Sequence, residues 1–197
     1  MPKLLTALGG IAVVGVLILL VFGSFVFGTY NGLVTKDENV KTLWGQVEST
    51  YQRRFDLVDQ LVEPAKASLR QEQSVFNAIA EARTRYAGTS SNSPEQREAM
   101  GGFDSALARL LVIVENYPEL RSTDVMIGLM DQIEGTENRI NVARRRYNEG
   151  TQDYNTTIRR IPANIIAGMF GFERAELFEA EEGAEKAPKI NLEVNVE

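Results

Sequence analysis

The sequence predicts an all-α protein, in which an N-terminal transmembrane helix is followed by an antiparallel bundle of three to four long helices. Three observations predict this fold class. Residues 4–27 are almost wholly apolar, and about 20 apolar residues suffice to cross the hydrocarbon core of a membrane. Further along the chain, apolar residues recur at alternating steps of three and four, which is the period of one helix face. Prolines and short polar stretches separate these periodic segments.

The first element is the membrane segment, which we assign to an anchor domain of residues 1–29. No charged side chain occurs between Leu4 and Thr35. The apolar run is longer than the hydrophobic region of a signal peptide, which covers about 7–15 residues, so we expect it to remain in the membrane. A buried core helix is the alternative, but such helices rarely run this long without polar residues.

The charges that flank this segment predict its orientation. The amino terminus and Lys3 precede the segment, whereas Lys36 and Lys41 follow it. Counting these charges by the positive-inside rule favours a cytoplasmic N-terminus. We therefore expect a single membrane pass that places the soluble domain outside the cytoplasm.

Residues 30–178 form the predicted bundle, and its first helix is expected at 30–87. Pro64 lacks an amide donor and clashes with the preceding turn, so we expect a kink near residues 60–64. A straight helix of this length would extend beyond about 80 Å at about 1.5 Å per residue. Its apolar face must therefore meet another subunit, or the chain must fold back at Pro64. The sequence leaves open whether this helix continues from the membrane segment.

The next helix is expected at residues 94–116, after a polar loop. Ser93 followed by Pro94 and Glu95 is typical of a helix start. A heptad stripe follows, formed by Met100, Phe103, Leu107, Leu110, Val114 and Tyr117. Because residues 110–114 are apolar all round, we expect this helix to be central in the bundle. Pro118 ends it.

A long helix expected at residues 122–161 organises the rest of the bundle. Residues 122–124 supply its cap and Pro162 ends it. Its stripe contains Met126, Leu129, Ile133, Thr136, Ile140, Ala143, Tyr147, Thr151, Tyr154, Ile158 and Ile161. A tyrosine–asparagine pair occurs at residues 147–148 and again at 154–155. The two pairs are one heptad apart, so they share a helix face.

Residues 164–172, with the sequence NIIAGMFGF, combine glycines with large apolar side chains. In one interpretation, the chain reverses here and the apolar side chains cover one end of the bundle. In the other, Met169, Phe170 and Phe172 form a patch that contacts the bilayer or a neighbouring subunit.

The C-terminal stretch, residues 179–197, is acidic and poor in large apolar groups. Such a composition does not bury enough apolar surface to fold, so we expect a mobile tail. Leu177 and Phe178, which precede the tail, are apolar enough to dock onto the bundle.

The composition of the chain argues against several classes of function. The formal net charge of −6 argues against a nucleic-acid binder, which would present a basic face. The chain has no cysteine and no histidine, which removes disulfides, thiol nucleophiles, zinc sites of the Cys/His type and imidazole bases. The pattern also lacks the base and orienting group that a serine, threonine or lysine nucleophile requires. We therefore expect neither an enzyme nor a bound cofactor.

Two groups of charged residues allow a functional and a structural interpretation. Glu134 and Glu137 share a helix face that Glu115 could approach, but a di-metal site in a bundle requires Glu-x-x-His on two helices. Ion pairs are the favoured interpretation, with Arg53, Arg54, Arg139 and Arg144 as the candidate partners. The clusters at 144–146 and 159–160 could bind anionic lipid, although a solvated face or pairing with nearby acids is favoured.

Several ordered blocks of motif residues run from the membrane segment to Phe178. They contain Tyr30, Asn31, Trp44, Arg54, Asp56, Glu115, Asn116, Tyr117, Pro118, Glu137, Arg139, Tyr147, Asn148, Tyr154 and Asn155. In order and spacing, these blocks resemble the LemA family. The sequence departs from the family pattern at Pro64 and at residues 124–125. It also has Gly28 and Thr29 where some relatives carry a lipobox cysteine, so the membrane segment itself must be the anchor.

The resemblance implies a bacterial protein of the cytoplasmic (inner) membrane with an antiparallel helical bundle after its membrane segment. The activity of the family is poorly defined. One relative, a magnetosome protein, is associated with forming an organelle membrane, and this supports a membrane-organising role by analogy only.

The function that we predict is structural. The long apolar stripes favour a membrane-anchored scaffold that self-assembles as a homo-oligomer and organises or remodels the membrane. The alternative is a monomeric or dimeric binding or regulatory module that presents its bundle to a membrane partner, which the sequence does not identify.

Overall fold

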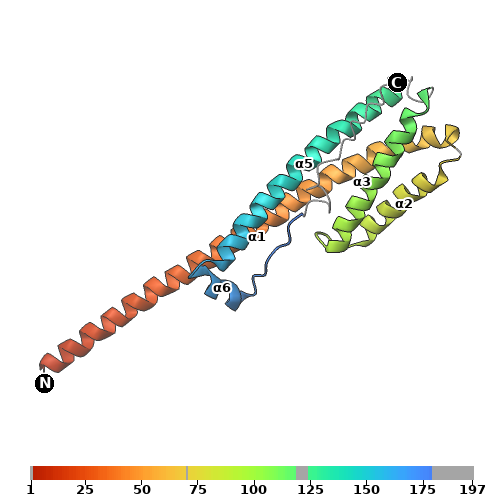
Figure 1. Ribbon diagram of the computed structural model, residues 1–197. Helices are drawn as coiled ribbons and strands as arrows, with labels where there is room; N and C mark the ends of the chain where they lie inside the picture. The colour runs from red at the N-terminus through yellow and green to blue at the C-terminus, as the bar shows by residue number, and fades with distance from the viewer. Residues whose placement is uncertain (1, 70, 119–123, 179–197) are drawn as a thin grey trace, which may run out of the picture.

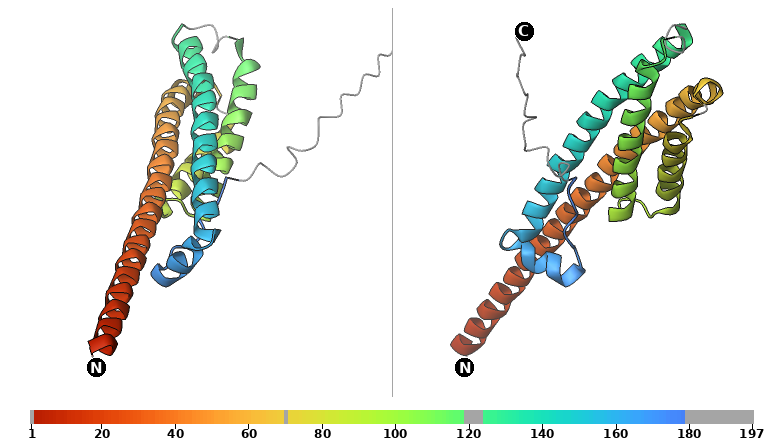
Figure 2. Two further views of the ribbon diagram at one scale, coloured as in Figure 1. Left: turned by 90° about the vertical axis from the view of Figure 1, so that its left-hand side faces the viewer. Right: turned by 45° about the vertical axis from the view of Figure 1, so that its right-hand side comes forward.

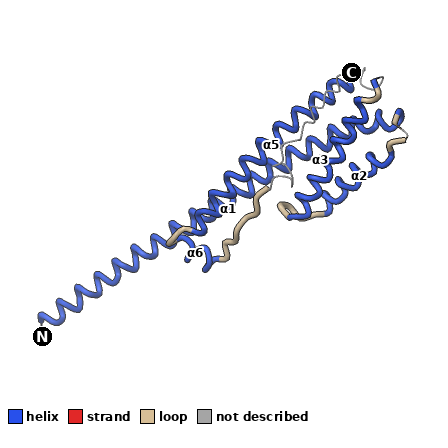
Figure 3. The backbone as a smooth tube through the Cα atoms, viewed as in Figure 1, coloured by secondary structure: helices blue, strands red, loops and turns tan. Residues whose placement is uncertain are grey.

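The computed structural model describes residues 2–69, 71–118 and 124–178, and it is all-helical over these ranges. The elements are α1 (Pro2–Ser68), α2 (Gln73–Gly88), α3 (Pro94–Glu115), α5 (Asp124–Arg159) and α6 (Ala163–Phe170). Figure 1 shows these helices along the chain, and Figure 3 shows the loops that join them. The predicted fold class, a membrane helix followed by a helical bundle, is confirmed. Residues 179–197, predicted to be a mobile tail, lie outside the described residues.

Helix α1 is continuous from the apolar N-terminal segment into the bundle. Its first part extends away from the other helices, whereas its second part forms the spine of the bundle (Figure 1). Large apolar side chains of the first part lack protein cover, with exposed fractions from 42% at Phe25 to 71% at Phe27. This part is long and apolar enough to cross a membrane, which indicates that the protein is membrane-anchored.

The bundle consists of two helix pairs. Helices α1 and α5 run antiparallel along most of the length of α5, and α2 and α3 form a hairpin that packs on one side of this pair (Figures 1 and 2). Gly150 of α5 packs closely on α1, because a Cβ atom there would overlap Cδ1 of Leu43. Aromatic rings join the hairpin to α1, such as Phe103 of α3 against Phe55 of α1.

The prediction of one helix over residues 30–87 is wrong. Helix α1 ends at Ser68, and α2 begins at Gln73 and runs back beside the bundle. Pro64 lies inside α1, so the chain folds back one turn after the proline rather than at it. The turn is stabilised by burial of Leu69, which is 1% exposed, and its amide donates to the carbonyl of Ala65 at 2.8 Å.

The helix predicted at residues 94–116 is confirmed as α3, but it is not central. Ser93 caps it by accepting a hydrogen bond from the amide of Gln96 at 3.1 Å. Leu110 and Val114 are buried, whereas Val112 between them is 59% exposed. An all-round apolar segment therefore lies on the side of the bundle, with one face open.

The long helix predicted at residues 122–161 is confirmed as α5, although residues 122 and 123 lie outside the described residues. Its predicted stripe is buried from Met126 to Ile158. Ile161 is the exception and is 84% exposed, because α5 ends at Arg159 and Ile161 lies in the turn that follows the helix. The short helix α6 follows, and Gly171 ends it in the left-handed conformation at a φ of 73°.

Candidate functional site: a groove that holds the C-terminal strap

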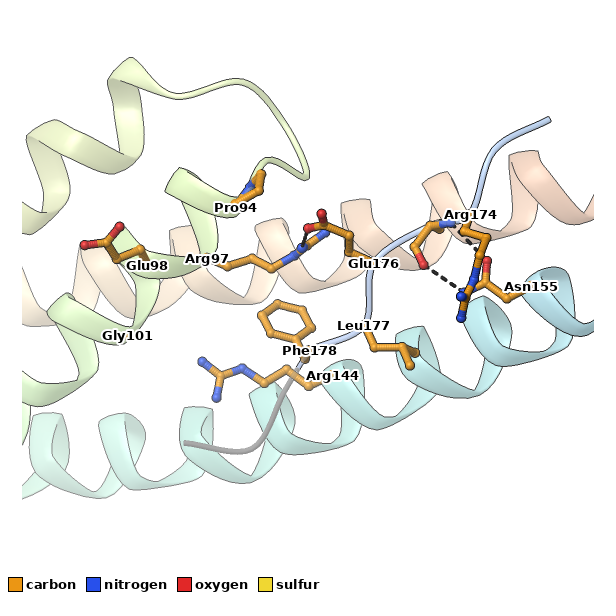
Figure 4. A pocket seen from close by; sticks show the side chains of 11 residues that line it. Pro94, Arg97, Glu98, Gly101, Arg144, Asn155, Arg174, Glu176, Leu177 and Phe178 are labelled. Carbon is orange, nitrogen blue, oxygen red and sulfur yellow. Dashed lines mark hydrogen bonds and ion pairs between the residues drawn. The ribbon is translucent and has the colours of Figure 1, made fainter. Parts of the chain in front are cut away.

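The strap is residues 171–178, which follow α6 and run without regular secondary structure along the groove between α5 and the start of α3 (Figures 3 and 4). Phe172, Ala175 and Phe178 are partly buried, whereas the residues between them are exposed. A three-residue period is that of an extended, polyproline-like chain with one face on a surface. Every third side chain of the strap is therefore turned toward the bundle and partly buried.

The two tyrosine–asparagine pairs of α5 bind the strap backbone. The side-chain amide of Asn155 donates to the carbonyl of Ala175 at 2.8 Å, and its oxygen accepts from the amide of Ala175 at 2.9 Å. Asn148 makes the same two bonds to Phe178, at 3.0 and 2.8 Å. The hydroxyls of Tyr154 and Tyr147 donate to the carbonyls of Glu173 and Glu176, at 2.9 and 2.8 Å. We call these four side chains the Tyr–Asn ladder.

The spacing of the ladder matches the spacing of the strap. Seven helical residues advance by about 10.5 Å, and three residues of an extended chain advance by about 9–10 Å. The two pairs therefore bind strap positions that are three residues apart. The asparagines bind Ala175 and Phe178, and the tyrosines bind Glu173 and Glu176. Because the bonds go to backbone atoms, the ladder recognises an extended peptide of defined register rather than particular side chains.

An aromatic and arginine cluster holds the side chain of Phe178. Its ring stacks on Trp44 with centroids 5.3 Å apart and meets the edge of Tyr147 at 5.6 Å. The guanidinium carbons of Arg144 and Arg97 lie 5.1 and 5.9 Å from its centroid, which is within the range of a cation–π interaction. A large flat side chain is thus specified at this position of the strap.

Arg97 connects the loop before α3 to the strap. Its guanidinium donates to the side-chain oxygen of Asn92 at 2.7 Å, pairs with Glu176, and lies 5.4 Å from the Trp44 ring. Asn92 adopts a φ of 61°, a left-handed conformation that asparagine tolerates better than most residues. The loop geometry therefore orients the arginine that pairs with the strap.

A polar network beneath Phe178 joins three helices. Arg54 of α1 bonds to Asp104 of α3 at 2.7 Å and also pairs with Glu137 of α5. Arg144 of α5 bonds to Asp104 at 2.9 Å, and the hydroxyl of Tyr51 donates to the same carboxylate at 2.7 Å. The side chain of Arg54 is only 4% exposed, so this network is the buried link between the hairpin and the α1–α5 pair.

The pKa values of this network reflect burial and pairing. Burial raises the pKa of Asp104, although the Tyr51 hydroxyl and the two guanidinium groups act against it. Burial also raises the pKa of Tyr51, and the Asp104 charge adds to that effect. Burial opposes ionisation of Glu137, but the hydrogen bond and charge of Arg54 outweigh it and lower the pKa of Glu137.

The groove beside the strap has a volume of about 840 Å³. Figure 4 shows Arg97 and Glu98 lining it from α3, Arg144 and Asn155 from α5, and the strap crossing it. Within the described residues, no three acidic side chains gather as a metal site would require. Amides, guanidinium groups and aromatic rings are groups that bind and orient, so the arrangement is suited to holding an extended peptide.

The structure brings together about half of the predicted motif residues. Trp44, Arg54, Glu137 and the four ladder residues gather around the groove, and Tyr30 contacts the rings of Phe170 and Phe172 next to it. The others lie apart from the groove: Asn31, Asp56, Glu115, Asn116, Tyr117, Pro118 and Arg139. Among these, Asn116 caps the end of α3, and its side chain donates to the carbonyl of Val112 at 3.1 Å.

Sequence reasoning missed two functional residues and anticipated two others only in part. Asp104 was missed, although a single acid at the edge of the apolar stripe of α3, beside Phe103, is a signal that could have identified it. Arg97 was also missed, because nothing local marks it. Arg144 was expected to be a solvated or paired side chain, and it is paired. Docking was predicted for Leu177 and Phe178, and only Phe178 docks, since Leu177 is 41% exposed.

The fold and the groove define the class of this molecule as a membrane-associated helical bundle. The model of the LemA family matches residues 43–192, and the chain belongs to the LemA family. It is similar to magnetosome proteins MamQ 2 and MamQ 1 of Paramagnetospirillum magneticum, with 30% identity over 192 residues, or 85% of this chain and 71% of each relative. Magnetosome protein MamQ of Magnetospirillum gryphiswaldense is 28% identical over 84% of this chain and 70% of its own length.

Proposed function

We propose that this protein is a membrane-anchored scaffold that self-assembles at the bacterial cytoplasmic membrane and organises or remodels it. The continuity of α1 carries this proposal. One helix from Pro2 to Ser68 contains both the membrane segment and the spine of the bundle, so no linker separates them. An enzyme that must reach diffusing substrates gains from a flexible tether, whereas a scaffold gains from a bundle held at a fixed height and direction.

Exposed apolar side chains at the end of the bundle farthest from the membrane segment support self-assembly. Val112 belongs to the last turn of α3, and Val125 and Ile127 belong to the first turn of α5, with exposed fractions from 46% to 72%. Figure 1 shows that these two helix ends lie far from the membrane segment. When exposed apolar residues cluster, they mark a contact between subunits more often than a free monomer surface. The similarity to magnetosome proteins supports a role at an organised membrane by analogy.

The orientation that we propose places the bundle outside the cytoplasm. The flanking lysines support it, as the positive-inside rule favours a cytoplasmic N-terminus. We also propose that the bundle performs no catalysis and needs no cofactor. The groups that line the groove are suited to binding, and none of them is paired with a general base in the way that nucleophilic catalysis requires.

The groove favours a second candidate function, a binding module for a membrane partner. The Tyr–Asn ladder bonds to backbone atoms of an extended segment, and a partner's segment with an aromatic residue at the position of Phe178 would satisfy the same groups. In this function the strap is the resident occupant of a peptide groove, and a partner replaces it.

The mass and negative-stain image of the full-length protein, extracted in mild detergent, separate the two functions. The scaffold predicts large uniform assemblies that become smaller in Val125→Asp. A monomer or dimer, unchanged by that substitution, contradicts the scaffold and leaves the binding module. Gln132→Asp, an exposed substitution on the same helix, is the matched control for added charge.

A further inference from the structure

Helix α6 and the turn before it expose a row of large apolar side chains. Ile161, Ile165 and Met169 follow one another at steps of four, and their exposed fractions are 84%, 60% and 72%. Phe170 lies beside this row, on the side of Ile166 that faces Tyr30, and is still 52% exposed. The opposite face of α6 packs inward, through Ile166 and Ala167. One side of this short helix is therefore apolar and uncovered within the described structure.

The position of this row relative to α1 suggests what covers it. The ring of Phe170 lies 4.7 Å from the ring of Tyr30, and Phe172 lies 5.8 Å from it. Tyr30 follows Phe27, where the apolar membrane segment ends. Figures 1 and 2 show α6 beside α1 at the point where α1 leaves the bundle. Because a membrane-embedded α1 places Tyr30 at the bilayer surface, α6 lies at that surface too.

Two arginines precede the apolar row. Arg159 and Arg160 are exposed, and neither takes part in an ion pair among the residues that the structure describes. Glu173 is the nearest exposed acid along the chain on the other side of α6. Basic side chains next to an apolar helix face are the composition of a segment that lies in the membrane interface and attracts anionic lipid.

We propose that α6 with Ile161 is a second membrane contact, which we call the foot. Its apolar row enters the boundary between headgroups and acyl chains, and Arg159 and Arg160 bind the phosphates of anionic lipids. Continuity with the membrane segment through Tyr30 favours a bilayer over a second copy as the occupant of this face. The inference rests on the anchoring role of α1 in the proposed function, but not on self-assembly.

The test uses the full-length protein, because a chain without cysteine accepts a single label. Met169→Cys and, as control, Gln132→Cys carry an environment-sensitive fluorophore in nanodiscs. Both parent side chains are exposed, so neither substitution disturbs the core. The foot predicts that lipids brominated in the acyl chain quench most of the emission at residue 169 and little at residue 132, while aqueous iodide does the reverse.

The arginines are tested in the Met169→Cys background. Arg159→Gln with Arg160→Gln is expected to reduce quenching by brominated lipid in nanodiscs that contain phosphatidylglycerol, and to change nothing in phosphatidylcholine alone. Equal quenching by iodide at residues 169 and 132 overturns the foot. A label at residue 169 that neither quencher reaches also overturns it, because this indicates a contact between copies. If α1 does not anchor the protein, the chain does not purify with the nanodisc. If the protein does not self-assemble, the mass measurement shows it, and the quenching result for the foot still stands.

Discussion

The two helix pairs of the bundle are joined by different kinds of contact. The α1–α5 pair is close enough for Gly150 to lie against Leu43, and its shared face is a long stripe of apolar residues with small polar ones, such as Thr136 and Thr151. The α2–α3 hairpin instead meets α1 through large rings, such as Phe55 against Phe103 at 4.5 Å, and through the Arg54 network. The α1–α5 pair is therefore a continuous core, whereas the hairpin is a docked unit whose attachment depends on a few side chains.

The largest expected effect is loss of the fold when a charge enters the shared core. Leu110 is 0% exposed, and an unpaired buried carboxylate costs several kcal/mol, so Leu110→Asp should abolish the cooperative melting transition. Circular dichroism of the full-length protein in detergent measures this. Ala108→Asp, two residues before Leu110 on α3, is the control: its side chain is exposed, and the melting curve should stay close to wild type. Two similar curves would show that the core is assigned incorrectly.

The next effect separates the hairpin from the pair. Arg54→Ala leaves Asp104 and Glu137 without their shared partner, and breaking a buried ion pair typically costs about 3–5 kcal/mol. Relative to wild type, hydrogen exchange should accelerate more in α2 and α3 than in the middle of α1 and α5. Arg53→Ala, an exposed neighbour, should leave exchange unchanged. Uniform acceleration in all four helices would contradict the description of the hairpin as a docked unit.

A smaller effect is expected at the strap. Asn155→Ala removes two hydrogen bonds and leaves the backbone of Ala175 unpaired, which costs about 1–3 kcal/mol. The strap should open more often, and trypsin should cleave faster after Arg174, which is exposed on the strap. Asn138→Ala, on an exposed position of the same helix, is the control. Equal cleavage rates in both variants would mean that the ladder does not hold the strap.

The smallest effect is a dependence of the hairpin contact on alkaline pH. Burial raises the pKa of Tyr86 from 10.0 to about 12, and the charge of Glu48 adds to the shift. A folded-state pKa above the unfolded value gives a stabilisation that is complete below pH 10.0 and is lost as the pH rises toward 12. Tyr86→Phe should therefore have a melting temperature close to that of wild type at neutral pH. Between pH 10.0 and 12, it should lose less stability than wild type. The same alkaline loss in both proteins would exclude Tyr86 as its source.

The sequence predicted those parts of the fold that depend on local pattern. The stripe of α5, the cap at Ser93 and the shared face of Tyr147 and Tyr154 follow from helix period and cap chemistry, and they are confirmed. A fold-back at Pro64 was one of two options that the sequence left open, but its position after Ser68 was not predicted. Pro64 is the stronger local signal, whereas the burial of Leu69 depends on distant partners.

The candidate site was predictable only in part, for the same reason. The ladder residues share a helix face by arithmetic alone, but their ligand is a strap that lies close to them only in the folded chain. Asp104 and Arg97 face residues about fifty or eighty positions away, and no local period encodes such pairings. Family resemblance identified Arg54 and Glu137 as motif residues without showing that Arg54 pairs with both Glu137 of α5 and Asp104 of α3.

The uninterrupted α1 also makes the thickness of the bilayer relevant to the height of the bundle. If α1 sits one residue deeper in the membrane, the bundle descends by about 1.5 Å. Copies in a bilayer of uniform thickness therefore hold their bundles at one height. A local change in thickness changes that height or leaves part of the apolar segment mismatched, at a cost of fractions of a kcal/mol per ångström.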